Sequence, residues 1–360
     1  MKSQPLAVST WGEEEKQALL DVIESGRFTM GDKVAQFEQE YAAWVNTSYA
    51  VMCNSGSSAN LLMVAAYTLR FGPGTVIVPA VSWSTSYSPF QQYGWKLKFV
   101  DIDPDTLNYN IEALREAYTG EELILAVNLL GNPNQYNQFP SMDVLEDNCE
   151  SMGAMYYGMR TGNFGLMASH STFFSHHIQT MEGGIVTTDD EYFYHTLLCL
   201  RSHGWTRHLP EKNKLGVLPS DYEFIMPGYN LRPIEMMGAL GSAQLKKLEG
   251  FIETRRENAE RWKEYCAKRG WWSQKEVEHG KSSWFAFAIV DDNIEEIKKE
   301  LKADGVEYRP IVGGNFTRSA SLRFYNYQVH AGLPNADRVH EKGLYIGNTH
   351  EVIDFDNGQN

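Results

Sequence analysis

The sequence predicts an α/β protein whose larger part is built on a mostly parallel central sheet. Short apolar runs alternate with helix-like stretches from about residue 45 to 190, which is typical of strand–helix–strand units. Helical patterns then dominate from residue 231 to about 269. A strand–helix–strand pattern follows them, which indicates a second, smaller unit.

The elements are expected in the following order. The first clear helix covers 57–71, where Leu61, Leu62, Ala65, Ala66 and Leu69 share one face. Short buried strands are expected at 75–79, 98–101, 123–129, 142–146 and 185–188. After the helices of 231–269, a strand is expected at 284–290, a helix at 293–305 and a strand at 306–312.

These elements suggest two domains. Residues 1–249 would form an N-terminal segment and the large domain, and 250–360 a small C-terminal α+β domain. Residues 353–360 are expected to be a frayed tail.

The charge balance limits the partners. With 46 acidic and 32 basic residues the net charge is −14, which argues against nucleic-acid and anionic membrane surfaces as partners. The N-terminus lacks an apolar signal core, and no apolar stretch approaches the roughly 20 residues of a membrane span. We therefore expect a cytoplasmic protein.

The four cysteines are widely spaced, at Cys53, Cys149, Cys199 and Cys266. No CxxC pair and no finger spacing is present. We expect four reduced thiols in an intracellular protein and no metal site.

Three motifs suggest a ligand site at sheet edges. The turn 54–60 (NSGSSAN) leads into the first helix, where Gly56 allows close approach and free amides favour an anion. Asp147 and Glu150 follow the strand of 142–146, and Trp83 follows another strand. Each motif has a plainer explanation: a capped loop, a solvated acidic loop, and an aromatic core residue.

Together these motifs resemble the sugar aminotransferases, a family of aspartate-aminotransferase-like (fold type I) enzymes that depend on pyridoxal phosphate. The resemblance rests on seven segments from 25 to 350: SGRFTMGDKVAQFE, NSGSSAN, VPAVSW, EDNCESMGA, HSTFFSHHIQTMEGGIVTTDD, PGYNLRP and GLYIGNTH. It implies a large mixed-sheet domain plus a small α+β domain, a homodimer with shared active sites, and pyridoxal or pyridoxamine phosphate as the cofactor.

The family lysine that forms a Schiff base with the cofactor is missing. Aligned on Glu182-Gly183-Gly184, the residue in its place is His177, and there is no lysine between Lys98 and Lys212. An imidazole forms no stable imine but moves protons near neutral pH, with an ordinary pKa of about 6.5. The resemblance therefore implies that His177 is the catalytic acid and base.

The resemblance also assigns the other site residues. It places Gly56, Ser57 and Thr172 on the cofactor phosphate, Trp83 on the ring face, Asp147 on the pyridine nitrogen, Glu150 near the 3-hydroxyl, and Asn230 on the phosphate from the neighbouring subunit.

The lost lysine is typical of one subgroup, the 3-dehydratases of nucleotide-linked 4-keto-6-deoxysugars. One branch carries an iron–sulfur cluster, which the cysteine spacing argues against, and the other acts on a GDP-linked sugar with L-glutamate as amino donor. Five residues are candidates for holding the nucleotide sugar: His203, Arg207, Arg232, Arg309 and Asn315. A sugar 4-aminotransferase and a catalytically silent homologue remain alternatives.

Overall fold

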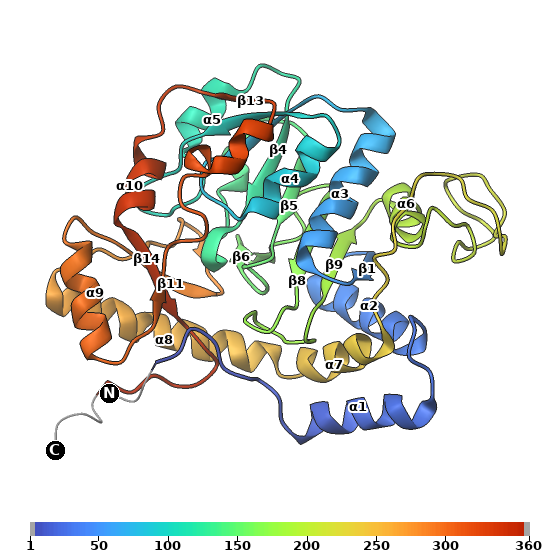
Figure 1. The fold of residues 1–360 in the computed structure, drawn as a ribbon, viewed down its shortest axis with the longest axis horizontal. Coiled ribbons are helices and arrows are strands. Elements are labelled where there is room, and N and C mark those ends of the chain that lie inside the picture. Colours follow the sequence, from blue (N-terminus) through green and yellow to red (C-terminus); the bar gives the residue numbers. More distant parts are fainter. Residues whose placement is uncertain (1–3, 356–360) are drawn as a thin grey trace.

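The computed structural model describes residues 4–355, and its centre is an eight-stranded sheet with strand order β1-β9-β8-β5-β4-β2-β3-β13 (Figure 1). From β8 to β13 all neighbours are parallel, whereas β9 is antiparallel to both β8 and β1. These strands are β1 (Tyr49–Cys53), β2 (Thr75–Pro79), β3 (Lys96–Val100), β4 (Leu123–Val127), β5 (Val144–Asp147), β8 (Met167–Ser171), β9 (Gly184–Thr188) and β13 (Tyr327–Val329). The predicted α/β class with a mostly parallel sheet is confirmed.

Helices cover both faces of this sheet, because alternate side chains of a strand point to opposite sides. Val51 and Val186 belong to the core that includes α3, while Met52 and Ile185 belong to the core beneath α2 and α7. The helices are α1 (Glu13–Ser25), α2 (Asp32–Val45), α3 (Gly56–Phe71), α4 (Ser84–Gln92), α5 (Ile111–Ala117), α6 (Glu191–Arg201), α7 (Glu235–Leu245), α8 (Leu248–Arg269), α9 (Ile294–Ala303) and α10 (Pro334–Lys342). Short 3-10 turns lie at Leu129–Gly131, Tyr136–Gln138, Phe316–Arg318 and Ala320–Phe324.

A smaller antiparallel sheet, β11-β14-β12, lies beside α8, α9 and α10 (Figure 1). Its strands are β11 (Ala286–Val290), β12 (Tyr308–Arg309) and β14 (Gly343–Gly347). Its core packs around Trp262, Phe287 and Ile346, all fully buried. A third sheet joins β6 (Met155–Tyr156), β7 (Met159–Arg160) and β10 (Gly280–Lys281).

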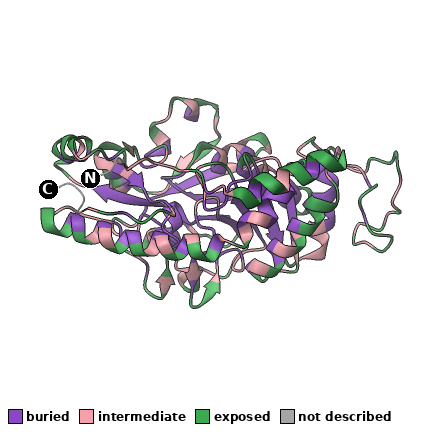
Figure 2. Ribbon diagram, turned by 90° about the horizontal axis from the view of Figure 1, so that it is seen from below, coloured by how far each residue is buried: buried purple, intermediate pink, exposed green. Residues whose placement is uncertain are grey.

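The C-terminal region also returns to the large sheet, because β13 pairs in parallel with β3. We propose that the small domain begins near residue 250, where α8 starts, with β13 as its contribution to the large domain. Figure 2 shows that the strands of both parts are buried.

Several predicted elements have shifted ends. β5 ends at Asp147 and not at 146, so the carboxylate occupies the last strand position. β11 begins at Ala286 because Trp284 has a φ of 48°, which no strand residue adopts. The prediction of a frayed tail is wrong for residues 353–355, because Ile353 is buried and the Phe355 ring stacks on Tyr265. Residues 356–360 lie outside the described part.

Within residues 4–355, no helix is both long enough and apolar enough to span a membrane. The cytoplasmic location stays a prediction.

Candidate active site

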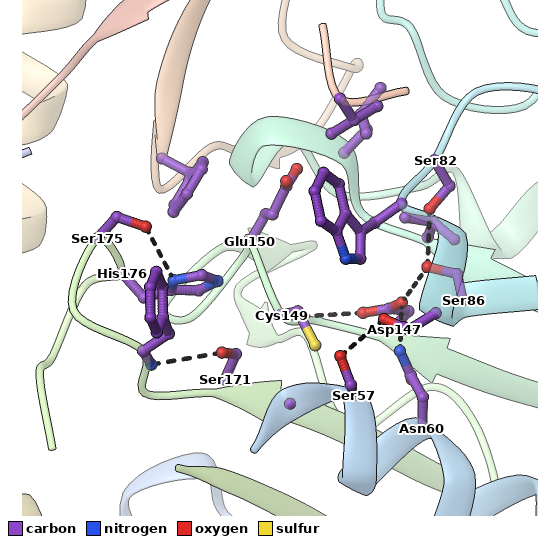
Figure 3. Close-up of a pocket in the computed structure, with 18 of the residues that line it drawn as sticks. Ser57, Asn60, Ser82, Ser86, Asp147, Cys149, Glu150, Ser171, Ser175 and His176 are labelled. Atoms are coloured by element: carbon purple, nitrogen blue, oxygen red, sulfur yellow. Dashed lines mark hydrogen bonds between the residues drawn. The ribbon is translucent and has the colours of Figure 1, made fainter. Parts of the chain in front are cut away.

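A cavity of about 400 Å³ lies at the carboxyl ends of the parallel strands β2, β4, β5 and β8. This edge is where open α/β sheets bind their ligands, because the loops that follow the strands converge there. Figure 3 shows the main groups around it. It is lined by Ser55, Gly56, Ser57, Asn60, Ser82, Trp83, Thr85, Ser86, Val127, Leu129, Asp147, Cys149, Glu150, Ser171, Phe173, Ser175, His176, Glu182, Phe285, Arg309, Pro310, Val312 and Tyr345.

The start of α3 forms the anion-binding side of the cavity. Ser55 is the N-cap, and its Oγ accepts a hydrogen bond from the amide of Ser58 at 3.1 Å. The amides of Gly56 and Ser57 have no intrahelical acceptor and point out of the helix start, where they favour a phosphate. A Cβ on Gly56 would lie 2.5 Å from the Cβ of Ser171, so only glycine lets these two segments meet.

A buried carboxylate lies beside this helix. Asp147 is 4% exposed and accepts hydrogen bonds from Asn60 Nδ2 at 2.9 Å and from Ser86 Oγ at 2.7 Å (Figure 3). No basic side chain of the described residues forms an ion pair with it. A buried carboxylate held only by neutral donors favours a cationic N–H partner, and the protonated pyridine nitrogen of the expected cofactor is such a group.

Trp83 and Glu150 face the space between these two sides. Trp83 is 57% exposed and forms a flat wall. Oε2 of Glu150 accepts a hydrogen bond from the amide of Leu130 at 2.9 Å. Burial, with a smaller contribution from Asp147, raises the pKa of Glu150 to about 7.

The structure places His176, and not the predicted His177, at the cavity. His177 is fully buried and does not line the cavity, because its Nε2 donates to the carbonyl oxygen of Ser283 at 3.2 Å. The neighbouring His176 lines the cavity instead, with a hydrogen bond between its Nδ1 and Ser175 Oγ at 3.4 Å (Figure 3). The prediction that His177 faces the ligand is wrong.

The residue predicted to hold the phosphate, Thr172, also differs by one position from the residue that lines the cavity. Thr172 is fully buried and its hydroxyl bonds to Thr180 Oγ1 at 2.5 Å, so the prediction that it holds the phosphate is also wrong. Ser171 lines the cavity beside Gly56. Ser171 lies five residues before His176, the same spacing as that of the predicted pair Thr172 and His177.

His176 is held as a neutral base. Its surroundings lower its pKa to about 3, first through burial and then through the positive charge of Arg255. Its Nε2 has no hydrogen-bond partner among the described residues. It can therefore take up a proton from a ligand in the cavity before it delivers one.

The predicted nucleotide-sugar residues divide into three groups. Arg309 lines the cavity. Asn315 does not: its Oδ1 accepts from the amide of Thr317 at 3.0 Å and its Nδ2 donates to Asp337 at 2.7 Å. It caps a 3-10 turn, so its predicted ligand role is wrong.

The third group lies on residues 202–232, which we call the arm. Part of this segment projects from the rest of the chain (Figures 1 and 2). His203, Arg207, Asn230 and Arg232 are on the arm, and none of them lines the cavity. Nε of Arg232 donates to Asn230 Oδ1 at 3.0 Å. Within one chain, the structure therefore does not bring these residues to the site.

Sequence reasoning missed several lining residues. Ser171 and His176 could have been found, because shifting the alignment by one residue gives the same five-residue spacing. Tyr345 lies in the quoted segment GLYIGNTH, whereas Phe285 lies outside the seven quoted segments. Asn60 and Ser86 gave no local pattern, because only the packing of α3 and α4 brings them to Asp147.

All four cysteines are free thiols. Cys149 lines the cavity, and burial raises its pKa well above the ordinary value. Within residues 4–355, no group of three or more His, Cys, Asp or Glu side chains could hold a metal ion.

Comparisons with known proteins find similar proteins over nearly the full length of the chain. The DegT/DnrJ/EryC1/StrS aminotransferase family matches residues 9–356. The chain is 47% identical to the GDP-4-keto-6-deoxy-D-mannose 3-dehydratase of Escherichia coli O55:H7, over 99% of this chain and 97% of that protein.

Two solved structures are also similar. A GDP-4-keto-6-deoxymannose-3-dehydratase with a trapped PLP-glutamate geminal diamine has a TM-score of 0.93 and 46% identity, over 98% of this chain and 97% of that chain. A histidine-to-asparagine variant of such an enzyme, with bound GDP-perosamine, has a TM-score of 0.92 and 46% identity, over 97% of this chain and 96% of that one.

Proposed function

The chain belongs to the DegT/DnrJ/EryC1/StrS aminotransferase family, and we propose that it removes the C3 hydroxyl of GDP-4-keto-6-deoxy-D-mannose with pyridoxal phosphate and L-glutamate. The product is a GDP-linked 4-keto-3,6-dideoxy sugar, of the kind used for colitose in O-antigen lipopolysaccharide. The observation that carries the proposal is the cavity itself. The side chains that line the cavity include a neutral histidine and no lysine. An anion-binding helix start and a buried carboxylate line the same cavity.

The residues present fit pyridoxal phosphate. Asp147 would accept the pyridine N–H, the amides of Gly56 and Ser57 with the Ser171 hydroxyl would hold the phosphate, and Trp83 would cover the ring. Glu150 would lie near the 3-hydroxyl. Bound there, the cofactor accepts the amino group of glutamate and then acts as the electron sink for loss of the sugar hydroxyl.

His176 replaces the family lysine as the proton carrier. With its pKa near 3 it is neutral at physiological pH, so its free Nε2 first acts as a base. Once protonated, the same nitrogen is the acid that assists departure of the C3 hydroxyl. An imidazole forms no Schiff base, so the cofactor is held by non-covalent contacts alone.

The arm would complete the site of a second copy in a homodimer. It projects away from its own chain (Figure 2) and carries exposed apolar side chains, Leu218 at 73% and Tyr222 at 85%. Asn230 would reach the partner's cofactor phosphate, and His203, Arg207 and Arg232 would reach the partner's GDP-sugar together with its Arg309. Two shared active sites per dimer follow from this arrangement.

One incubation tests the function. Enzyme, pyridoxal phosphate, glutamate and GDP-4-keto-6-deoxy-D-mannose should give free ammonia, 2-oxoglutarate and the 4-keto-3,6-dideoxy sugar. A stable 4-amino sugar without ammonia would identify a 4-aminotransferase instead, and no 2-oxoglutarate would indicate a silent homologue. Treatment with borohydride should leave no cofactor covalently bound to the chain.

A further inference from the structure

The segment Ser282–Phe285, which runs behind His176 and His177, is held by an unusual row of contacts. Each of its four consecutive carbonyl oxygens accepts a hydrogen bond from a different side chain. The donors are Arg256 Nε to Ser282 at 3.0 Å, His177 Nε2 to Ser283 at 3.2 Å, Asn348 Nδ2 to Trp284 at 2.8 Å and Arg255 Nη1 to Phe285 at 2.9 Å. Every carbonyl of the segment is therefore fixed from the side.

The backbone of this segment is strained. Trp284 has a φ of 48°, and the facing residue Leu130 has a φ of 55°. The two stretches are tied together, because the amide of Ser283 donates to Gly131 at 2.9 Å and the amide of Phe285 donates to Leu130 at 3.0 Å. Left-handed conformations of such residues are unfavourable and persist only where surrounding contacts impose them.

The strained segment and the stretch bonded to it contact two titratable groups of the cavity lining. The Phe285 ring lines the cavity and lies 5.0 Å from the His176 ring, centroid to centroid. On the other side, the amide of Leu130 donates to the Glu150 carboxylate. The position of Ser282–Phe285 therefore affects the positions of His176 and Glu150.

We propose that His177 is a positioning residue for His176. Its hydrogen bond to Ser283 ties the turn that carries His176 to the strained segment that packs Phe285 against the His176 ring. The two histidines are adjacent in this turn, so the anchoring of the buried His177 restricts the backbone that places His176 at the cavity.

His177 can act only as a donor in this place. A carbonyl oxygen accepts and does not donate, so Nε2 carries the hydrogen. Nδ1 is buried without a partner, and burial, followed by the charge of Arg255, lowers the pKa of His177 well below its usual value. The residue stays neutral and moves no proton, which distinguishes its role from that of His176.

The test compares two amides at this position. In His177→Gln the side-chain N–H stands where Nε2 stood and can still reach Ser283, whereas in His177→Asn it is too short. We expect His177→Gln to keep kcat within about threefold of wild type, and His177→Asn to lower kcat about tenfold or more with KM for glutamate changed less than about twofold.

A matched control separates positioning from general damage. His170 is equally buried, makes one bond of 3.2 Å to Thr187 Oγ1, has an unpartnered Nδ1 and does not line the cavity. His170→Asn should leave kcat unchanged. Equal kcat in the Gln and Asn variants of His177, or an equal loss in His170→Asn, would overturn the proposal.

A second readout needs neither cofactor nor turnover. In the cofactor-free protein, ring signals of His176 are assigned by nuclear magnetic resonance against the His176→Asn variant. We expect the pKa of His176 to rise toward its ordinary value in His177→Asn and to stay low in His177→Gln. An unchanged His176 titration in His177→Asn would overturn the inference.

The inference uses the proposed function only for its activity readout. If wild type released no ammonia, the function would fail while the histidine titration still tested the positioning role.

Discussion

The cavity wall and the arm both carry residues that the sequence predicts to bind the ligands, but the wall lies at strand ends and the arm is a long loop segment. The wall is formed by loops that directly follow parallel strands, so Asp147, Trp83 and Gly56 converge within one chain. The arm leaves the body of the chain, and its Asn230 and Arg207 touch no part of that cavity (Figure 1). Motifs at strand ends therefore meet at a site within one chain, whereas the motifs on the arm do not.

The wall and the arm should also differ in what their substitutions remove. Under the proposed function, wall residues carry the chemistry, so their loss should affect kcat in each chain separately. Arm residues would bind across the proposed dimer interface, so their loss should be repairable by a second chain.

The largest effect is expected at the wall. His176→Asn keeps the size and polarity of the side chain but removes the proton carrier. We expect the rate of ammonia release to fall about 10²–10⁴-fold, the usual contribution of a positioned acid and base. Thermal unfolding should stay at the wild-type temperature, since His176 makes only one long hydrogen bond of 3.4 Å. A variant within tenfold of wild type would exclude His176 as the proton carrier.

The next effect tests the arm directly. Asn230→Ala should weaken cofactor binding about ten- to a hundredfold, since it removes a hydrogen bond to a charged group. Mixing the Asn230→Ala and His176→Asn chains should restore about a quarter of wild-type activity, because one intact site forms in each mixed dimer. The same variants measured separately serve as controls. If the mixture is no more active than they are, the sites are not shared and the wall acts alone.

A smaller effect concerns the titratable carboxyl of the wall. Glu150 has a pKa raised from 4.5 to about 7, so the folded chain holds its proton more tightly than the unfolded chain. This contribution to the free energy of unfolding is complete below pH 4.5 and is lost as the pH rises through about 7, amounting to about 3 kcal/mol. Urea unfolding of the cofactor-free protein should show this loss in wild type and not in Glu150→Gln. If the free energy of unfolding changed equally with pH in the two proteins, Glu150 would have its ordinary pKa.

The smallest effect should lie outside both regions. Asn315→Ala removes the cap of a 3-10 turn and the hydrogen bond to Asp337. We expect a loss of about 1 kcal/mol in the free energy of unfolding with an unchanged KM for the GDP-sugar. A raised KM at unchanged stability would restore the ligand role that the sequence suggested.

Particular residues show how far the sequence could predict the site. Asp147, Gly56 and Ser57 were identified because they lie at strand ends or at a helix start, where backbone geometry alone positions them. The histidine was misplaced by one position. Two adjacent histidines look equivalent in sequence, and only the contacts of His177 with Ser283 show which one turns inward. Asn315 was misassigned because an amide that caps a turn and one that binds a ligand have the same local pattern.

The sequence by itself determined the fold class, the family and the absence of the Schiff-base lysine, because alternating apolar patterns and residue identities are local properties of the chain. Only the tertiary structure decided that His176 and Ser171 face the cavity while His177 and Thr172 support it from behind. The physical reason is that the surroundings of each side chain come from segments far away along the chain. His177 is bonded to Ser283, 106 residues away, and Ser171 lies against Gly56 at the start of α3.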